Sequence, residues 1–251
     1  LAKVTATSKV FGGEILLQNN KPTGILIDNA MELIKRVFPK PSEKLQRKMI
    51  LDAQKECLKY GLTTVSDAGV NQEDIDLIAK MQSEKVLKIR DYAMVSIGLR
   101  NIEYFTQKGI IKTDRLHVRS FKIYADGALG SRGANLLKPY SDDASNSGLA
   151  LMSKNEMDKY FEKIYVSDYQ ANTHCIGDSA NKVVLELYGK YLKSKNDRRW
   201  RIEHAQIIAP EDVSKYGQFS IIPSVQTTHA TSDMYWAEQR LGKERIKTAY
   251  I

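Results

Sequence analysis

Short apolar runs alternate with amphipathic stretches from about residue 42 onward. Runs such as GLTTVSDAG, rich in β-branched residues and closed by Asp or Gly, are typical of buried strands. Such runs lie at 61–69, 87–98, 116–127, 169–178, 199–206 and 217–226. Stretches with helical character precede several of them, at 42–60, 154–168, 179–194 and 209–217. This alternation predicts βα units arranged around a parallel sheet.

Polar side chains gather where the predicted strands end. The residues at or near these C-terminal ends are Lys122, Asn172, His174, His204 and Gln226. In a TIM barrel the active site forms at this rim from several strands, whereas an open doubly wound sheet usually concentrates its site at one switch point. No G-x-G-x-x-G or P-loop motif follows any predicted strand. We therefore expect an α/β fold of the (β/α)8 TIM-barrel type.

The first 41 residues break this alternation. The stretch FGGEILLQNNKPTGILID has hairpin-like turns at Gly12-Gly13 and Asn19-Asn20. We expect residues 1–41 to form an insertion packed on the barrel and residues 42–251 to form a partial TIM-barrel domain. No Pro/Gly/Ser linker, internal repeat or low-complexity tract suggests another boundary.

The alternation of side chains between the two faces of a strand predicts which polar residues point into the barrel. In RSFKIYA, Lys122 shares a face with Ser120 and Tyr124, and His117 lies on the opposite face. Phe121 shares the face of His117 and is expected to meet the outer helices.

The same reasoning applies to the two strands that follow. In QANTHC, Asn172 and His174 share a face, and in RWRIEHAQ, Trp200, Ile202 and His204 share one. One assignment of inward and outward faces therefore brings Lys122 together with His174 and His204 at the rim.

Lysine and histidine at such a rim are compatible with a metal site. Neutral imidazole is the commonest protein ligand for metals, and its second nitrogen needs an orienting acceptor. A free lysine is a poor ligand, but a carbamylated Lys122 would carry a carboxylate able to bridge two cations. Two alternatives stay open, namely hydrogen-bonded core histidines and a salt bridge between Lys122 and Asp126. His229, three residues beyond Gln226, is a candidate for substrate contact.

Charge and composition narrow the classes of partner. The net charge is +8 and is spread along the chain, and no zinc finger or RNP-like strand is present, so we expect no nucleic-acid partner. No apolar run approaches a membrane span, so we expect no membrane partner.

Cys57 and Cys175 fit no metal or redox spacing and favour a cytoplasmic protein. Cys175 should pack against helices, since it faces away from His174. The chain begins with Leu1, so a signal peptide upstream stays open.

Taken together, these stretches resemble the amidohydrolase superfamily. The matching segments are GLTTVSDAG, FKIYADGALGSRGA, THCIGDSAN, RIEHAQ and PSVQTTHATSD, in the order that the family shows. The similarity runs from about Gly24 to the C-terminus and is greatest to the amidohydrolase family 3 branch that contains N-substituted formamide deformylases. The segments are specific as a set, whereas each alone is a weak signal.

The resemblance implies a distorted TIM barrel that holds one or two divalent metals, most often zinc. By the family pattern, Lys122 on the fourth barrel strand would be the bridging, carbamylated ligand. His174 and His204, on the fifth and sixth strands, would be metal ligands, and these three residues would be the catalytic set. On the substrate side, the residues implied are Asp126, Gly127, Ser131, Gln226 and His229.

Two features of the family pattern are missing. The family carries a His-x-His pair on its first strand and an aspartate after its eighth, and the chain has no H-x-H. We therefore expect barrel strands two to seven in this chain, without the first and eighth strands or the flanking β-sandwich. Such a fragment would have two unpaired edges, which favour self-association.

The resulting hypothesis is a metal-dependent amidohydrolase. It would hydrolyse a non-peptide C–N bond of a small-molecule amide or formamide through metal-activated water. Two alternatives stay open: a truncated, non-catalytic barrel with a binding role, and a phosphotriesterase-like hydrolase with the same fold and metals.

Overall fold

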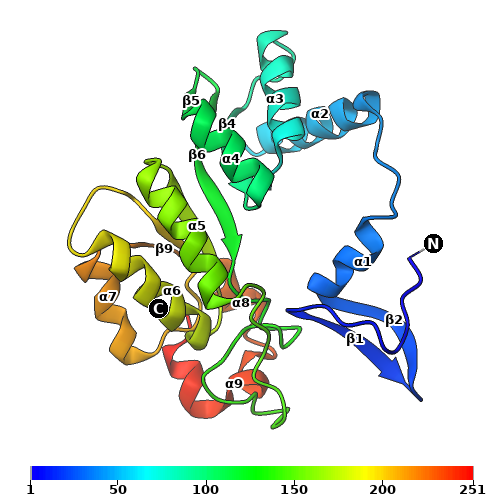
Figure 1. The fold of residues 1–251 in the computed structure, drawn as a ribbon, viewed down its shortest axis with the longest axis vertical. Coiled ribbons are helices and arrows are strands. Elements are labelled where there is room, and N and C mark those ends of the chain that lie inside the picture. The colour runs from blue at the N-terminus through cyan, green and yellow to red at the C-terminus, as the bar shows by residue number, and fades with distance from the viewer. Residues whose placement is uncertain (1, 251) are drawn as a thin grey trace. The chain divides into compact units, whose positions relative to one another are not determined.

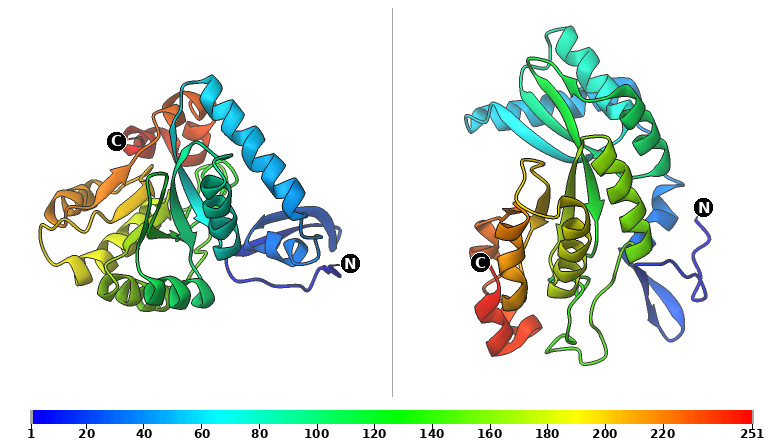
Figure 2. Two further views of the ribbon diagram at one scale, coloured as in Figure 1. Left: turned by 90° about the horizontal axis from the view of Figure 1, so that it is seen from above. Right: turned by 60° about the vertical axis from the view of Figure 1, so that its left-hand side comes forward.

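The structure, a computed structural model, describes residues 2–250, which divide into two compact units (Figure 1, Figure 2). Unit 1 contains the residues up to Phe38, Tyr124–Glu162 and the residues from Thr173 onward. Unit 2 contains Pro39–Ile123 and Lys163–Asn172. In this described part of the chain, no helix is both long and apolar enough to span a membrane.

The strands of the main sheet follow one another in the order in which they occur along the chain. That order is β3 (Thr64–Val70), β4 (Arg90–Ser96), β6 (Leu116–Tyr124), β7 (Gln170–Cys175), β8 (Arg201–His204) and β9 (Ile222–Ser224). The pairs β3–β4, β4–β6 and β8–β9 are parallel, and the short β5 (Ile111–Lys112) pairs antiparallel with β6. The predicted α/β fold with a parallel sheet is therefore confirmed. Within residues 2–250 the strand order runs from β3 to β9 without returning, so the strands form an open half-barrel and not a complete TIM barrel.

In unit 2, α2 (Glu43–Lys59) has defined signals at both ends. The Ser42 hydroxyl accepts a hydrogen bond of 3.3 Å from the backbone N–H of Leu45, which caps the first turn. Just beyond the last turn, Gly61 has a φ of 75°, a left-handed conformation that glycine adopts without steric cost. The predicted helix at 42–60 is thus confirmed almost to the residue.

The core of unit 2 is built on α3 (Gln72–Ser83) and α4 (Leu99–Lys108). Ile75, Ile78 and Met81 follow one another at three-residue spacing and are all buried, which places one apolar stripe of α3 in the core. Phe105 of α4 is completely buried, and its backbone carbonyl oxygen accepts a hydrogen bond of 3.1 Å from the hydroxyl of Tyr169.

Unit 1 begins with the antiparallel hairpin of β1 (Gly13–Gln18) and β2 (Lys21–Asp28), followed by α1 (Glu32–Lys35). The predicted turn at Asn19-Asn20 joins the two strands, and both residues have positive φ, 51° and 59°. A two-residue turn with positive φ at both positions matches the twist of a hairpin, and asparagine tolerates that conformation well. The predicted turn at Gly12-Gly13 is also observed, one residue earlier than expected: Gly12 has a φ of 68°, and the backbone N–H of Gly13, the first residue of β1, donates to the carbonyl oxygen of Val10 at 3.2 Å.

The remaining elements of unit 1 include two helices that contribute to a cluster of aromatic side chains. These elements are α5 (Lys154–Val166, which continues into unit 2), α6 (Asp178–Leu192), α7 (Val213–Gln218), α8 (Thr228–Ser232) and α9 (Ala237–Arg245). Trp200 is completely buried, and its ring centroid lies 4.7 Å from that of Tyr188 in α6 and 5.9 Å from that of Phe161 in α5. Trp200 therefore faces the helices.

A β-bulge in β6 overturns the predicted position of His117. Ala93 of β4 pairs with Val118, but the next residue, Met94, pairs with Ser120, so Arg119 is an extra residue in the ladder. Because an extra residue reverses the alternation of faces, His117 lies on the same face of the sheet as Ser120 rather than on the opposite one. Its ring contacts that of Tyr92, with 5.6 Å between centroids, as their direct pairing requires.

Candidate active site

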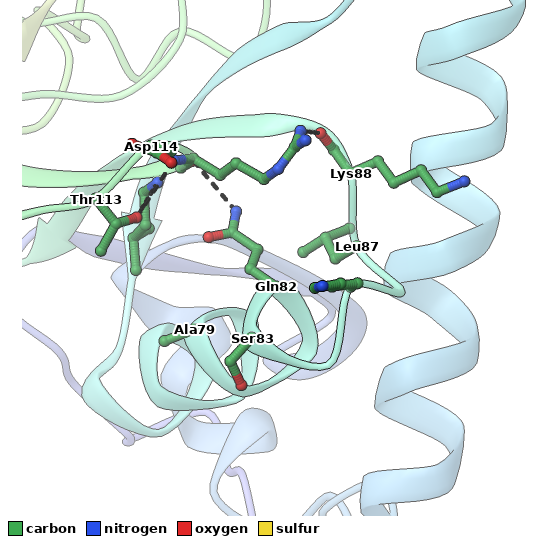
Figure 3. A pocket seen from close by; sticks show the side chains of 10 residues that line it. Ala79, Gln82, Ser83, Leu87, Lys88, Thr113 and Asp114 are labelled. Carbon is green, nitrogen blue, oxygen red and sulfur yellow. Dashed lines mark hydrogen bonds between the residues drawn. The ribbon is translucent and has the colours of Figure 1, made fainter.

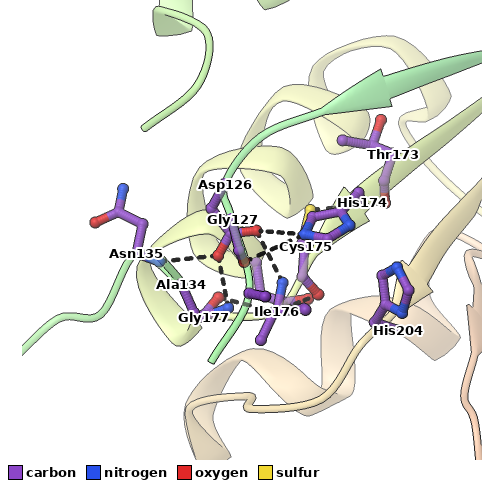
Figure 4. A network of polar contacts seen from close by, with 12 residues as sticks. Asp126, Gly127, Ala134, Asn135, Thr173, His174, Cys175, Ile176, Gly177 and His204 are labelled. Carbon is purple, nitrogen blue, oxygen red and sulfur yellow. Dashed lines mark hydrogen bonds and ion pairs between the residues drawn. The ribbon is translucent and has the colours of Figure 1, made fainter. Parts of the chain in front are cut away.

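His174 and His204 lie side by side in unit 1. Their ring centroids are 4.5 Å apart and their planes are inclined by 68° (Figure 4). His174 is close to the C-terminal end of β7 and is 9% exposed, whereas His204 is the last residue of β8 and is more accessible. The structure thus brings together two of the three residues for which we expect a ligand role.

The position of His174 follows from strand alternation. The hydroxyl of Thr173 lies 2.8 Å from that of Tyr188 in α6, so Thr173 faces the helices and His174 faces the opposite side. Cys175 shares the face of Thr173 and is completely buried, in agreement with its expected packing. The Nε2 atom of His174 lies 3.3 Å from the carbonyl oxygen of Gly127. Because a carbonyl oxygen only accepts hydrogen bonds, this contact requires a proton on Nε2.

Asp126 is the carboxylate behind His174. Its Oδ1 atom lies 3.4 Å from His174 Nε2, and the residue is completely buried. Three backbone N–H groups donate to the carboxylate: Ile176 at 3.0 Å, Gly177 at 2.8 Å and Asn135 at 2.9 Å (Figure 4). Burial raises the pKa of Asp126 to about 7, although these three backbone donors act in the opposite direction. A carboxylate held in this way can orient His174 but has no surface with which to contact a substrate.

His204 reaches His174 through an unusual backbone conformation. Glu203 faces away from the helices, because its carboxylate pairs with Arg201, whose guanidinium also donates to the Ser224 hydroxyl of β9. Alternation would then place His204 among the helices, on the same side as Trp200. The φ angle of His204 is instead 72°, in the left-handed region. The prediction that His204 shares a face with Trp200 is therefore wrong, and the turn of the backbone at the end of β8 is what directs the imidazole toward His174.

Gln226 connects His204 to His229. The Oε1 atom of Gln226 lies 2.5 Å from Nδ1 of His204 and 2.6 Å from Nε2 of His229. The other nitrogen of His229, Nδ1, lies 3.2 Å from Oδ2 of Asp233. Both nitrogens of His229 thus lie within hydrogen-bond distance of oxygen atoms. The residues predicted for the substrate side after β9 therefore adjoin the histidine pair.

The loop after β6 contains the other predicted site residues. Gly127 is buried, and a Cβ atom there would lie 2.3 Å from Oδ2 of Asp28, so only glycine allows this approach. Ser131 is exposed, and its hydroxyl donates to the carbonyl oxygen of Ala128 at 3.2 Å. Of this loop's candidates, Ser131 alone has its side chain at the surface, whereas Asp126 and Gly127 lie inside.

Lys122 belongs to unit 2, where it is 3% exposed. Its Nζ atom lies 3.4 Å from the carbonyl oxygen of Ile123, so the side chain folds back along β6. Asn172, also of unit 2, is completely buried on β7.

Unit 2 also has a hollow of about 540 Å³ (Figure 3). The side chains around it include Gln82, Leu87, Lys88, Thr113 and Arg115. The amide of Gln82 donates to the carbonyl oxygens of Ile89 and Arg115 at its wall. None of the predicted site residues lines this hollow, so it is not the substrate pocket that the sequence implies.

Sequence reasoning missed two carboxylates, Asp233 beside His229 and Asp28 beside Gly127. Asp233 receives hydrogen bonds from the amide of Gln206 at 3.0 Å and from the hydroxyl of Tyr250 at 3.5 Å, in addition to its contact with His229. The four-residue spacing of His229 and Asp233 on one helical turn was the available signal. Asp28, whose pKa is raised by burial, lies next to Gly127 but is about 100 positions away in sequence, and no local pattern indicates that contact.

The histidine pair has the donor chemistry of a metal site. Each ring has one nitrogen next to an oxygen acceptor, a contact of the kind that orients metal-binding imidazoles. Across residues 2–250, no three His, Cys, Asp or Glu side chains converge closely enough to hold an ion by themselves. The pair accordingly fits a metal as two of its ligands and not as a complete site.

Comparison with known proteins agrees with the fold and the motifs. The profile of the amidohydrolase family matches residues 3–250. Among curated proteins, the Arabidopsis thaliana protein LONG AFTER FAR-RED 3 is 31% identical over 99% of this chain and 45% of its own length. The putative amidohydrolase YtcJ of Bacillus subtilis is 31% identical over 95% of this chain and 46% of its own length. The chain thus spans about half the length of the curated relatives it matches.

Two solved structures are also similar. Uncharacterised metal-dependent hydrolases from Pyrococcus furiosus and Pyrococcus horikoshii each superpose with a TM-score of 0.80, at 25% and 27% sequence identity. The matches cover 93% and 94% of this chain and 49% and 48% of those chains. A match over nearly the whole chain, together with the paired histidines at the strand ends, leads to one conclusion: the chain belongs to the amidohydrolase family.

Proposed function

We propose that this chain forms part of a metal-dependent hydrolase that cleaves a non-peptide C–N bond in an amide or formamide. The observation that carries the proposal is the pairing of His174 with His204 at 4.5 Å, with Asp126 behind His174. Two adjacent imidazoles, each oriented through one nitrogen, are typical of ligands to a divalent metal. The match to the amidohydrolase family and the similarity to solved metal-dependent hydrolases support the metal-dependent hydrolase part of the proposal.

The residues have distinct roles in this proposal. His174 and His204 would hold a divalent ion, with zinc the expected metal because imidazole suits it. A carbamylated Lys122 would supply a further ligand. A divalent ion in such a site lowers the pKa of a bound water and polarises a carbonyl.

The chain's own side chains then orient the reactants. The Asp126 carboxylate and the Gly127 carbonyl hold the His174 ring in one tautomer. Gln226 fixes the His204 ring in the same manner. His229 contacts Asp233, and its ring centroid lies 6.0 Å from that of His204, so we assign it to the substrate carbonyl or leaving group.

The formamide deformylase-like branch gives the narrower proposal for the substrate. The support is the set KIYADGALGSR, HCIGDSA and RIEHAQ, which this chain shares with that branch. N-formyl and N-acyl amines are therefore the first compounds to test, and phosphotriesters are the comparison that separates the rival reaction with the same fold and metals.

The test measures metal and activity together in the full-length protein. Elemental analysis should find zinc or another divalent metal in the wild type, and much less in Lys122→Ala and His204→Ala. Thr173→Val is the matched control, because its side chain faces α6 and it should keep its metal. Wild-type metal content in both variants would contradict the assignment of Lys122 and His204 as metal ligands. Hydrolysis of phosphotriesters without hydrolysis of N-formyl amines would favour the phosphotriesterase-like reaction.

A further inference from the structure

Asn172 has two buried polar atoms without a protein partner. Neither Oδ1 nor Nδ2 forms a hydrogen bond within residues 2–250, and the residue is completely buried. A buried donor or acceptor left in this state costs about 1–3 kcal/mol, so two on one side chain require an explanation. The missing partner must both donate a hydrogen bond to Oδ1 and accept one from Nδ2.

The register of the sheet places Asn172 beside Lys122. Strands β6 and β7 are neighbours, and the backbone N–H of Ala125 donates to the carbonyl oxygen of His174 at 3.0 Å. In a parallel ladder this bond pairs Tyr124 with His174, and their ring centroids are indeed 5.7 Å apart. Two residues earlier on both strands, Lys122 pairs with Asn172.

Both side chains lie on the same face of the sheet. Thr173 faces α6, so Asn172 faces the other side. Phe121 contacts the ring of Tyr169, whose hydroxyl bonds to α4, so Lys122 also faces away from the helices. The contact of Lys122 Nζ with the carbonyl oxygen of Ile123 keeps the amine near the level of the sheet rather than extended beyond it.

A lysine ammonium cannot satisfy Asn172. It has three donors and no acceptor, so it could serve Oδ1 and would leave Nδ2 without a partner. A carbamate presents an N–H and a carboxylate oxygen side by side, as the amide of asparagine presents Oδ1 and an N–H. The two groups are complementary and can form two parallel hydrogen bonds.

We propose that Asn172 is the positioning residue for carbamylated Lys122, donating from Nδ2 to a carbamate oxygen and accepting at Oδ1 from the carbamate N–H. This inference rests on the proposed function, which needs the carbamate as a metal ligand, and adds the residue that selects and orients it. In the reaction, the ammonium releases a proton and the neutral amine attacks the carbon of CO2. The N–C bond forms, one C–O π pair moves to oxygen, and nitrogen loses a second proton to give the anionic carbamate.

The test detects the carbamate directly, without reference to catalysis. The full-length protein is titrated with 13C-bicarbonate, and the carbamate signal is followed by 13C NMR, with Lys122→Ala as the blank. We expect the bicarbonate concentration for half-occupancy to rise by about tenfold or more in Asn172→Leu, since a hydrogen bond to a charged group contributes about 1.5–3 kcal/mol. Thr173→Val should titrate as the wild type does.

Asn172→Asp is a second test of the inference, in case Asn172→Leu does not fold. It keeps the shape of the side chain but presents a negative charge to the carbamate, so the signal should be abolished while circular dichroism stays that of the wild type. An unchanged titration in either folded variant, or no carbamate in the wild type at saturating bicarbonate, overturns the inference. A wild type that is carbamylated but binds no metal would instead refute the proposed function and leave the role of Asn172 standing.

Discussion

Replacement of Asp91 by asparagine should change how the stability of the protein depends on pH. Asp91 lies on β4 in unit 2 and is 6% exposed, and its Oδ1 atom has no hydrogen-bond partner within residues 2–250. It lines a cavity of about 130 Å³ with Asp67, Cys57 and several aliphatic side chains. An ionised Asp91 carboxylate is desolvated in this cavity and lies close to the carboxylate of Asp67.

The size of the expected change in stability follows from the pKa of Asp91. Burial, and then repulsion from Asp67, raise the pKa of Asp91 from 3.8 to about 7. The folded protein therefore binds this proton more tightly than the unfolded chain does, so stability is greatest below about pH 4 and falls until pH 7. A shift of about 3 pH units corresponds to about 4 kcal/mol, of which about 3 kcal/mol is lost between pH 5 and pH 8.

The assay is thermal or urea denaturation of the wild type and Asp91→Asn at pH 5, 6, 7 and 8. The variant lacks the titrating proton, so its stability relative to the wild type should rise by about 3 kcal/mol over this range. Asp114→Asn is the matched control, because Asp114 is an exposed carboxylate in the same unit. Parallel pH profiles for the wild type and Asp91→Asn would refute the burial argument.

Three further substitutions test the interior of unit 1. Asp126→Asn should destabilise by about 2–3 kcal/mol in urea denaturation, because an amide N–H would face a backbone donor such as Gly177; a neutral result would contradict those contacts. Gly127→Ala should destabilise through the contact of 2.3 Å with Asp28, and Asp28→Ala should restore much of the loss; additive effects would speak against that contact. Trp200→Ala should lower the free energy of unfolding by about 3–5 kcal/mol, and a loss below 1 kcal/mol would be incompatible with its complete burial.

The order of strands and helices was predictable from the sequence because it depends on local periodicity. Each predicted strand overlaps an observed one, and the helices at 42–60 and 179–194 are observed as α2 and α6. Two departures from simple alternation were not predictable. The extra residue Arg119 moves His117 to the other face of β6, and the left-handed turn redirects His204. Neither the bulge nor the turn changes the pattern of apolar and polar residues, because both are set by neighbouring strands.

The candidate site was predictable in part for the same reason. His174 lies where strand alternation puts it, and His204 reaches the same place although alternation alone would have sent it elsewhere. Asp28 approaches Gly127 only through tertiary folding, since the two belong to segments far apart in the chain. Asp126 was predicted for the substrate side, whereas it is buried and its carboxylate accepts three backbone hydrogen bonds.

The backbone conformation at the end of β8 places the imidazole of His204 beside His174 but lowers the stability of the fold. His204 and Ala205 both have positive φ, 72° and 43°, a conformation that costs about 1–2 kcal/mol for a residue with a Cβ atom. Glycine at either position would relieve that strain, so a search for stabilising substitutions would select against the imidazole. Replacement of His204 by glycine would therefore gain stability at this position and remove the imidazole that lies beside His174.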